Sequence, residues 1–449
     1  MEGPRRVLGL RDLVVVAAAA MGPAFSLATT MAAMIAAAGA WSSAALALVA
    51  LLMAAIAVGY RRLGERLRDA GSSYAWIRAA FGAEIGAYGA WVLIVANLFG
   101  VLATALPAGA YTLDLAAPGL AANGGAVAAV GGAWIVAASL LLWYGLRPTA
   151  ELTLALLAAE LLVLGAAAAL AALHPHRDAV AFVTAPPVAG GLVGAIVVGI
   201  WTIDGWEVSA STAEEAEGAA SVPGSGGLAG LVVTSIILLG ATAAFERIGS
   251  ARGFAAHPAD ALAYIGTLLG GYWHGALTVT VLVSLAASLQ TSLIYLSRSL
   301  YAMGRDGLLP AALGRLDRRR EPAAAVWTIG VLSLAFAAAA GVSANAAGAF
   351  TFVLQGTSWF LGVLFVMTAA AAVRMFAPER EARWSGVVLP AVGGTALAAI
   401  LTLGLLGYDP ATRGFIAVST IIGLPLAVWR GGTVRRAVRR GGASPGSRC

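Results

Sequence analysis

The chain has 449 residues, of which 60% are hydrophobic and only 11% are charged, and its formal net charge is +6. Soluble domains carry roughly 45–50% apolar and about 25% charged residues, so this composition excludes a soluble globular protein and predicts an all-α integral membrane protein. The single cysteine, Cys449, leaves no disulfide framework.

A transmembrane helix needs about 20 mainly apolar residues, and this measure divides the chain into about twelve spans within a single domain, 1–449. We expect the spans at residues 12–37, 42–61, 84–113, 126–145, 150–173, 190–213, 227–247, 272–302, 323–341, 347–374, 385–407 and 413–429. The connections between them are too short to form a separate soluble domain.

The first and sixth spans are interrupted at matching places. The sequence Met21-Gly22-Pro23-Ala24-Phe25-Ser26 cuts the first span, and Trp201-Thr202-Ile203-Asp204-Gly205-Trp206-Glu207 cuts the sixth. Unpaired backbone is tolerated at membrane depth only where it lines a cavity or is buried in protein. Paired interruptions in two halves of a chain therefore indicate a substrate site of a secondary transporter, although the structural alternative for Gly22-Pro23 alone is a simple proline kink.

An interrupted helix offers amide donors at the start of one half-helix and carbonyl acceptors at the end of the other. A zwitterionic amino acid suits both, and we expect the backbone from Gly22 to Ser26 to hold its carboxylate. The predicted substrate-binding residues are Met21, Gly22, Pro23, Ala24, Phe25, Ser26, Trp201, Thr202, Asp204 and Gly205.

Glu160 lies inside the fifth span, where a carboxylate is costly and usually marks function. Three hypotheses stay open: Glu160 carries a proton, it binds sodium together with Ser288 of the eighth span, or it makes a neutral hydrogen bond between helices. Ser288, Gln290 and Ser292 are the polar residues of the eighth span that most merit testing.

The arginines predict the orientation. All 28 basic residues are arginines, and 24 of them fall in segments that share a side with the N-terminus, against Arg177, Arg247, Arg252 and Arg413 opposite. Because cytoplasmic loops retain positive charge, we expect both termini in the cytoplasm, a location in the cell membrane, and contact with anionic lipid. The basic charge is a topology signal, so no nucleic-acid partner is expected.

Three separated motifs resemble the amino acid permeases of the amino acid, polyamine and organocation (APC) superfamily. They are Met21-Gly22-Pro23, the stretch from Ala70 to Gly82 (AGSSYAWIRAAFG), and the stretch from Ser297 to Pro310 (SRSLYAMGRDGLLP). The resemblance implies a leucine-transporter-like fold, with inverted repeats of five helices at 12–173 and 190–374, broken helices 1 and 6, two additional helices at 385–429 and a basic cytoplasmic tail at 430–449.

The resemblance also implies roles for residues of the sixth span. Trp201 sits where an aromatic gate covers the substrate, Asp204 lies near the substrate side chain, and Glu207 stands where relatives carry a proton-responsive acid. One departure is plain, because the loop after Glu214 and Glu215 lacks the basic residue that many relatives have. We expect Glu214 and Glu215 themselves to form a solvated helix end.

The sequence therefore predicts proton-coupled symport or exchange of amino acids or related amines. Asp204 decides between amino acids and amines as substrates, since an acid beside the site favours a substrate with a cationic end. The alternatives are a polyamine or amine permease, a membrane amino acid sensor, and a channel. No phosphate-binding loop, catalytic triad or metal-ligand spacing is present in the sequence, so we expect neither an enzyme nor a cofactor nor a metal. The oligomeric state is left open.

Overall fold

The computed structural model describes residues 3–182, 189–341 and 346–441, and its regular structure is helical throughout these ranges. The first half contains α1 (Leu10–Met21), α2 (Pro23–Ala38), α3 (Ser42–Arg66), α4 (Ser73–Phe81), α5 (Ala83–Ala116), α6 (Gly124–Tyr144) and α7 (Leu146–Leu173). The second half contains α8 (Ala189–Thr202), α9 (Val208–Ser211), α10 (Val222–Phe245), α11 (Ala251–Ala256), α12 (Ala261–Leu269), α13 (Trp273–Arg305), α14 (Ala323–Gly341), α15 (Ala346–Phe376), α16 (Leu389–Leu405) and α17 (Pro410–Gly441).

Short turns complete the described chain. They are the 3₁₀ turns η1 (Gly39–Trp41), η2 (Pro118–Leu120), η3 (Val180–Phe182) and η4 (Ala213–Glu215), and a π-helical turn, η5 (Arg383–Val388), that leads into α16. Residues 1–2 and the last eight residues of the predicted basic tail lie outside the described residues.

The all-α membrane fold expected from the sequence is confirmed. Among the described residues, ten helical segments are long and apolar enough to cross a membrane, and the first of them, Leu10–Arg66, contains α1, α2 and α3. With the shorter apolar helix α8, these segments cover all the predicted spans of the described chain. The sixth span is shorter than predicted, since α8 ends at Thr202 and only the short α9 follows, because Gly205 turns the chain.

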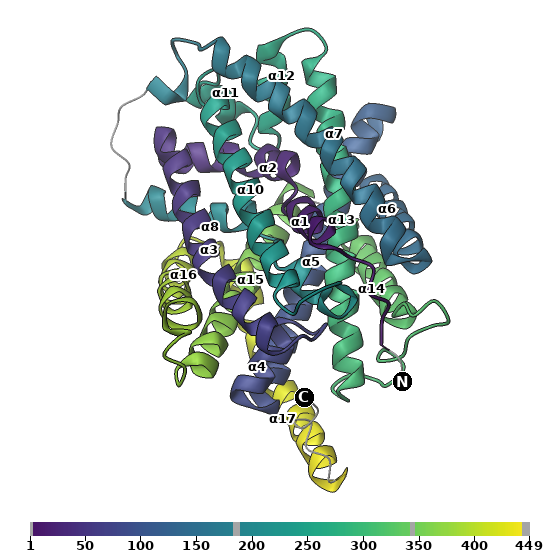
Figure 1. The fold of residues 1–449 in the computed structure, drawn as a ribbon. Coiled ribbons are helices and arrows are strands. Elements are labelled where there is room, and N and C mark those ends of the chain that lie inside the picture. Colours follow the sequence, from purple (N-terminus) through teal and green to yellow (C-terminus); the bar gives the residue numbers. More distant parts are fainter. Residues whose placement is uncertain (1–2, 183–188, 342–345, 442–449) are drawn as a thin grey trace.

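Three short helices occupy connections for which no helix was predicted. They are α4, which follows α3, and α11 and α12, which lie between α10 and α13 (Figure 1). Ser250 and Asp260 start α11 and α12 by accepting hydrogen bonds from Gly253 N–H and Ala263 N–H, at 3.1 and 2.8 Å. Such side-chain caps satisfy amide groups that a short helix leaves unpaired.

The long helices α5 and α13 form the buried centre of the bundle, and α13 packs against α1, α2, α5 and α7. Around them, α6, α14, α16 and α17 keep more of their surface exposed, as expected of helices that face lipid. Glycines allow close packing: a Cβ on Gly131 of α6 would lie 2.5 Å from the Ala105 carbonyl oxygen of α5.

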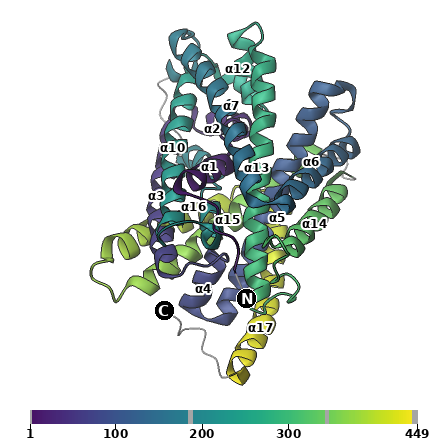
Figure 2. The same cartoon turned by 45° about the vertical axis from the view of Figure 1, so that its right-hand side comes forward.

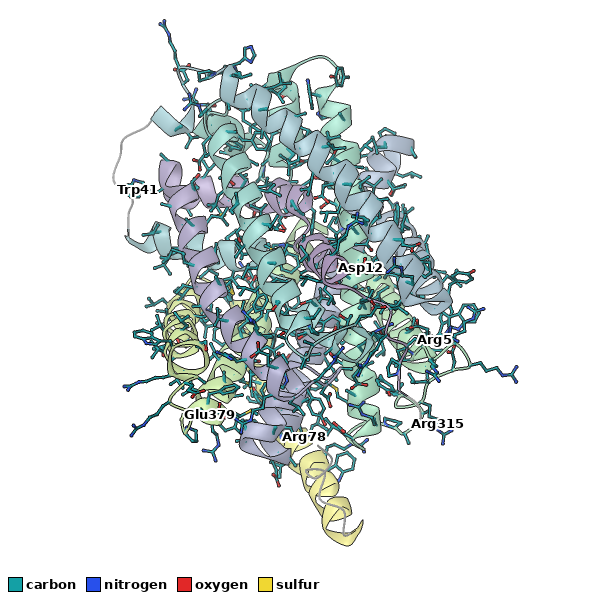
Figure 3. All side chains as sticks on the ribbon, viewed as in Figure 1. Arg5, Asp12, Trp41, Arg78, Arg315 and Glu379 are labelled. Atoms are coloured by element: carbon teal, nitrogen blue, oxygen red, sulfur yellow. The ribbon has the colours of Figure 1, made fainter. Side chains whose placement is uncertain are left out.

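The arginine-rich segments gather at one end of the molecule. The N-terminal segment, α4 and the outer end of α17 lie at the lower end in Figures 1 and 2, whereas α11 and α12 lie at the opposite end. Figure 3 places Arg5, Arg78 and Arg315 in the lower half, and Trp41 higher up. The tertiary arrangement thus brings together arginine-rich segments that the sequence predicted to lie on the same side as the N-terminus.

Candidate functional site

The first interruption is a break between α1 and α2 at Gly22. Gly22 has φ 51° and ψ 66°, a left-handed conformation that favours glycine, and Pro23 begins α2, where a missing N–H costs nothing. A Cβ on Gly22 would lie 2.4 Å from Ser288 Oγ of α13. Backbone conformation and close contact therefore both require glycine here.

The second interruption joins α8 to α9. Gly205 has φ 104°, and a Cβ on it would lie 2.7 Å from the carbonyl group of Ala20, near the end of α1. The two breaks, about 180 residues apart in the sequence, are therefore in direct contact. Thr202 Oγ1 also donates a hydrogen bond to Thr30 Oγ1 of α2 at 2.9 Å, which ties α8 to α2.

A buried cavity of about 50 Å³ lies where the breaks meet. Eight of the residues predicted for binding, gating or coupling line it: Met21, Phe25, Ser26, Trp201, Asp204, Gly205, Glu207 and Ser288. Gly22, Pro23, Ala24, Thr202 and Glu160 do not line it. The lining also includes Ser292, which the sequence had singled out, and polar residues of α5 and α13 that it had not: Asn97, Thr104, Thr291 and Tyr295.

Trp201 lies between the central cavity and a second one. Its ring meets Phe25 edge-on, with centroids 6.4 Å apart and planes at 87°. Trp201 also lines a cavity of about 250 Å³ between α8, α15 and α16, which Gln355 and Tyr408 border as well. Trp201 therefore lines both spaces.

The amide donors at the start of α2 already have partners within the chain. Ala24 N–H donates to Glu160 Oε1 at 2.7 Å, and Phe25 N–H donates to Ser284 Oγ at 3.1 Å. Gly22 N–H donates to Ala19 O and Ser26 N–H to Gly22 O, at 3.1 and 2.7 Å. The protein's own carboxylate, Glu160, therefore stands at the helix N-terminus where an anion is favoured.

Glu160 is buried on α7, with 1% of its surface exposed, and its second oxygen, Oε2, has no hydrogen-bond partner among the described residues. It borders a space between α7 and α13 rather than the central cavity. Ser288 contacts α1 instead, since its hydroxyl donates to Ala19 O at 3.0 Å. Glu160 and Ser288 thus both form hydrogen bonds with the first break, at Ala24 and Ala19 respectively.

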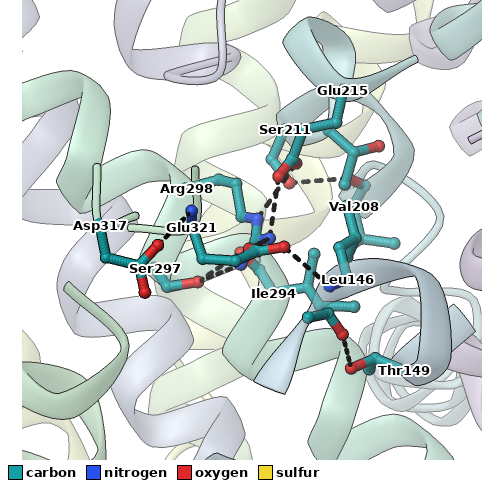
Figure 4. A network of polar contacts seen from close by, with 12 residues as sticks. Leu146, Thr149, Val208, Ser211, Glu215, Ile294, Ser297, Arg298, Asp317 and Glu321 are labelled. Atoms are coloured by element: carbon teal, nitrogen blue, oxygen red, sulfur yellow. Dashed lines mark hydrogen bonds and ion pairs between the residues drawn. The ribbon is translucent and has the colours of Figure 1, made fainter. Parts of the chain in front are cut away.

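A buried ion cluster lies at the arginine-rich end of α13 (Figure 4). Arg298 donates to Glu215 through two nitrogens, at 3.1 and 2.9 Å, and to Glu321 at 2.7 Å. Glu321 in turn accepts a hydrogen bond of 2.9 Å from Leu146 N–H at the start of α7. The cluster therefore connects η4, α13, the segment before α14 and the start of α7.

The expectation that Glu214 and Glu215 form a solvated helix end is wrong. Glu215 is 3% exposed, and Glu214 pairs with Arg305 at 2.7 Å. Burial raises the pKa of Glu215 to about 6, although Arg298 beside it acts in the opposite direction. The sequence did hold a signal, because Arg298 falls inside a predicted span, and an arginine at that depth needs a buried anionic partner.

Arg68, which follows α3, supplies a cation to the loop that lacks its own basic residue. Its guanidinium donates to Ala213 O at 2.6 Å, to Gly218 O at 3.1 Å, and also to Ala216 O. The N-terminal segment holds the same loop, because Val7 and Leu8 N–H donate to Glu215 O at 2.8 and 3.1 Å. The loop is thus held from two sides, by Arg68 and by the N-terminal segment.

Within the described ranges, no three His, Cys, Asp or Glu side chains gather into a metal-binding group. The central cavity instead combines two carboxyl groups, from Asp204 and Glu207, with amides, hydroxyls and aromatic rings. Such a lining suits reversible binding of a small polar molecule.

Comparison with known proteins adds two findings. The sequence pattern of a family described as "Amino acid permease" matches residues 8–425. The chain is also 25% identical, over 354 residues, to the branched-chain amino acid permease BcaP of Lactococcus lactis subsp. cremoris (strain MG1363), covering 69% of this chain and 72% of that protein.

Proposed function

The chain belongs to the amino acid permease family, and we propose that it is a secondary active transporter that moves amino acids or closely related amines across the cytoplasmic membrane by alternating access. The observation that carries the proposal is the direct contact of the two helix breaks around one buried cavity. Broken helices at one shared site are the arrangement by which transporters bind a substrate from either side.

Reconstitution into liposomes tests the proposal. Purified protein should exchange a radiolabelled amino acid or amine in a counterflow assay run over a substrate panel. Gly22→Leu should abolish exchange, because the side chain would collide with Ser288 and cannot adopt the left-handed backbone without strain. Gly39→Leu is the matched control, since Gly39 has φ 56° but open space around it. Normal exchange by a well-folded Gly22→Leu variant would contradict the site.

We further propose that transport is coupled to protons, as symport or exchange, with Glu160 as the main carrier and Glu207 as the second candidate. Glu160 keeps a buried oxygen without a hydrogen-bond partner, which supports this role. In Glu160→Gln, the amide oxygen still accepts the Ala24 N–H, so the fold and counterflow should persist. Accumulation driven by an inward proton gradient should be lost.

The paired experiment compares counterflow with gradient-driven uptake in the same vesicles, with and without sodium. Accumulation that follows sodium and ignores pH would favour a sodium site at Glu160 and Ser288 instead. A Glu160→Gln variant that still concentrates substrate would leave Glu160 as a structural hydrogen-bond acceptor and transfer the proton role to Glu207.

The distribution of arginine supports a topology with both termini in the cytoplasm and the arginine-rich end against anionic lipid. Cys449 is the single cysteine and serves as a natural probe. A membrane-impermeant maleimide should leave it unlabelled in intact cells and label it after permeabilisation. Tyr272→Cys, in a Cys449→Ser background, is the control for the opposite side, because Tyr272 is exposed beside the start of α13. Labelling of Cys449 in intact cells would reverse the orientation.

A further inference from the structure

The backbone amides at the first break leave little for a substrate carboxylate to bind. At the start of α2, the amides of Ala24 and Phe25 already donate to Glu160 and Ser284, and Pro23 has no N–H. A substrate carboxylate would have to displace these side chains, one of which is itself a carboxylate. The anion position that the half-helix creates is therefore occupied by the protein.

The opposite holds on the α8–α9 side of the cavity. Asp204 Oδ1 and Glu207 Oε2 are buried and have no hydrogen-bond partner among the described residues, and both side chains line the cavity. Glu207 is only 2% exposed. The lining residues include these two acids and neither arginine nor histidine. Two carboxyl groups thus face one small space without a countercharge.

An unpaired buried carboxylate is costly, and a bound cation with hydrogen-bond donors removes most of that cost. An ammonium group has three donors and can satisfy both free oxygens together. Resting on the transporter function proposed above, we infer that the site selects substrates with more cationic nitrogens than carboxylates, such as dibasic amino acids or small diamines, and that Asp204 and Glu207 bind the additional cationic group.

Competition in proteoliposomes measures this selectivity. Lysine, ornithine and putrescine should inhibit counterflow at concentrations at least tenfold below those needed for leucine or alanine. Asp204→Asn should weaken the binding of the cationic compounds by about thirtyfold or more and that of the neutral ones much less. The reason is that removing one partner of a buried charge pair costs much binding free energy. Glu207→Gln provides a second isosteric variant at the same cavity.

A binding measurement on the unaltered protein avoids dependence on variant folding. The apparent melting temperature in detergent should rise with lysine or putrescine and stay unchanged with leucine at the same concentration. Asn97→Ala is a control at the same cavity that removes no charge, so it should not change the ratio of cationic to neutral affinity.

The outcomes separate this inference from the transporter proposal. Exchange of neutral amino acids with exclusion of cationic ones overturns the cation inference and leaves the transporter proposal intact. Equal weakening of all substrates by both Asp204→Asn and Glu207→Gln also overturns it. A folded protein that exchanges nothing on the panel overturns the transporter proposal, and the inference with it.

Discussion

This protein has two sets of buried acids, and their surroundings differ. Glu215 and Glu321 share Arg298, with charge-assisted hydrogen bonds of 2.7–3.1 Å. Asp204 and Glu207 face a cavity, each with an oxygen that has no hydrogen-bond partner among the described residues. Both sets are costly to bury, but the first recovers part of that cost from Arg298 within the fold, whereas the second is free to recover it from a ligand.

The two sets of acids should therefore have different roles, one in stability and the other in binding. The Arg298 cluster connects four segments at the arginine-rich end and should close that end when it is intact. The cavity acids should contribute little to stability, since each has an oxygen without a hydrogen-bond partner among the described residues. Neutralising the Arg298 cluster should therefore lower stability, whereas neutralising the cavity acids should impair transport and leave stability nearly unchanged.

The largest expected effect comes from Arg298→Met. Removing the cation leaves Glu215 and Glu321 buried without their partner, which should destabilise the protein by about 3–5 kcal/mol. Thermal unfolding followed by size-exclusion chromatography in detergent measures the loss. Adding Glu215→Gln and Glu321→Gln to the variant should recover most of it.

Arg305→Met is the matched control for this change. Arg305 also bridges two acids, Asp69 and Glu214, but its side chain is 34% exposed. Water and salt screen such a pair, so its loss should cost at most about 1 kcal/mol. Equal destabilisation by Arg298→Met and Arg305→Met would break the distinction between buried and screened pairs.

A smaller effect separates Glu215→Gln from Glu207→Gln. The first change weakens hydrogen bonds to a charged group and should cost about 1.5–3 kcal/mol of unfolding free energy. The second removes a charge that forms no ion pair among the described residues, so stability should stay within about 1 kcal/mol or rise. Melting temperatures of both variants, measured side by side at pH 7, test the difference. A larger loss for Glu207→Gln would mean that the cavity acid has a structural partner.

The smallest effect is a pH dependence that belongs to Glu215. Its pKa is raised from 4.5 to about 6 in the folded protein, mainly by burial. A raised pKa contributes stability below 4.5, and this contribution is lost as the pH rises through about 6. The difference amounts to about 2 kcal/mol at most, at 1.36 kcal/mol per pKa unit. The slope of melting temperature from pH 4.5 to 7 should therefore be smaller in Glu215→Gln, and parallel slopes would contradict the assignment.

Much of the fold followed from the sequence, because the features that determine it are local. Apolar runs of sufficient length predict the spans wherever they pack, and Gly22-Pro23 and Gly205 interrupt helices through their own backbone preferences. The arginine distribution likewise requires no knowledge of contacts. Eight of the residues predicted for binding, gating or coupling line one cavity.

Only the tertiary structure decided which charged groups have partners. Glu160 reaches Ala24 across 136 positions, and Arg298 reaches Glu215 across 83. The sequence therefore placed Glu215 in solvent and left Glu160 with three open roles. Local patterns carry no record of such pairings, since they depend on how distant helices pack against each other. The sequence by itself determined the spans, their breaks and the charge asymmetry, whereas helix packing decided which acids are paired and which face the cavity.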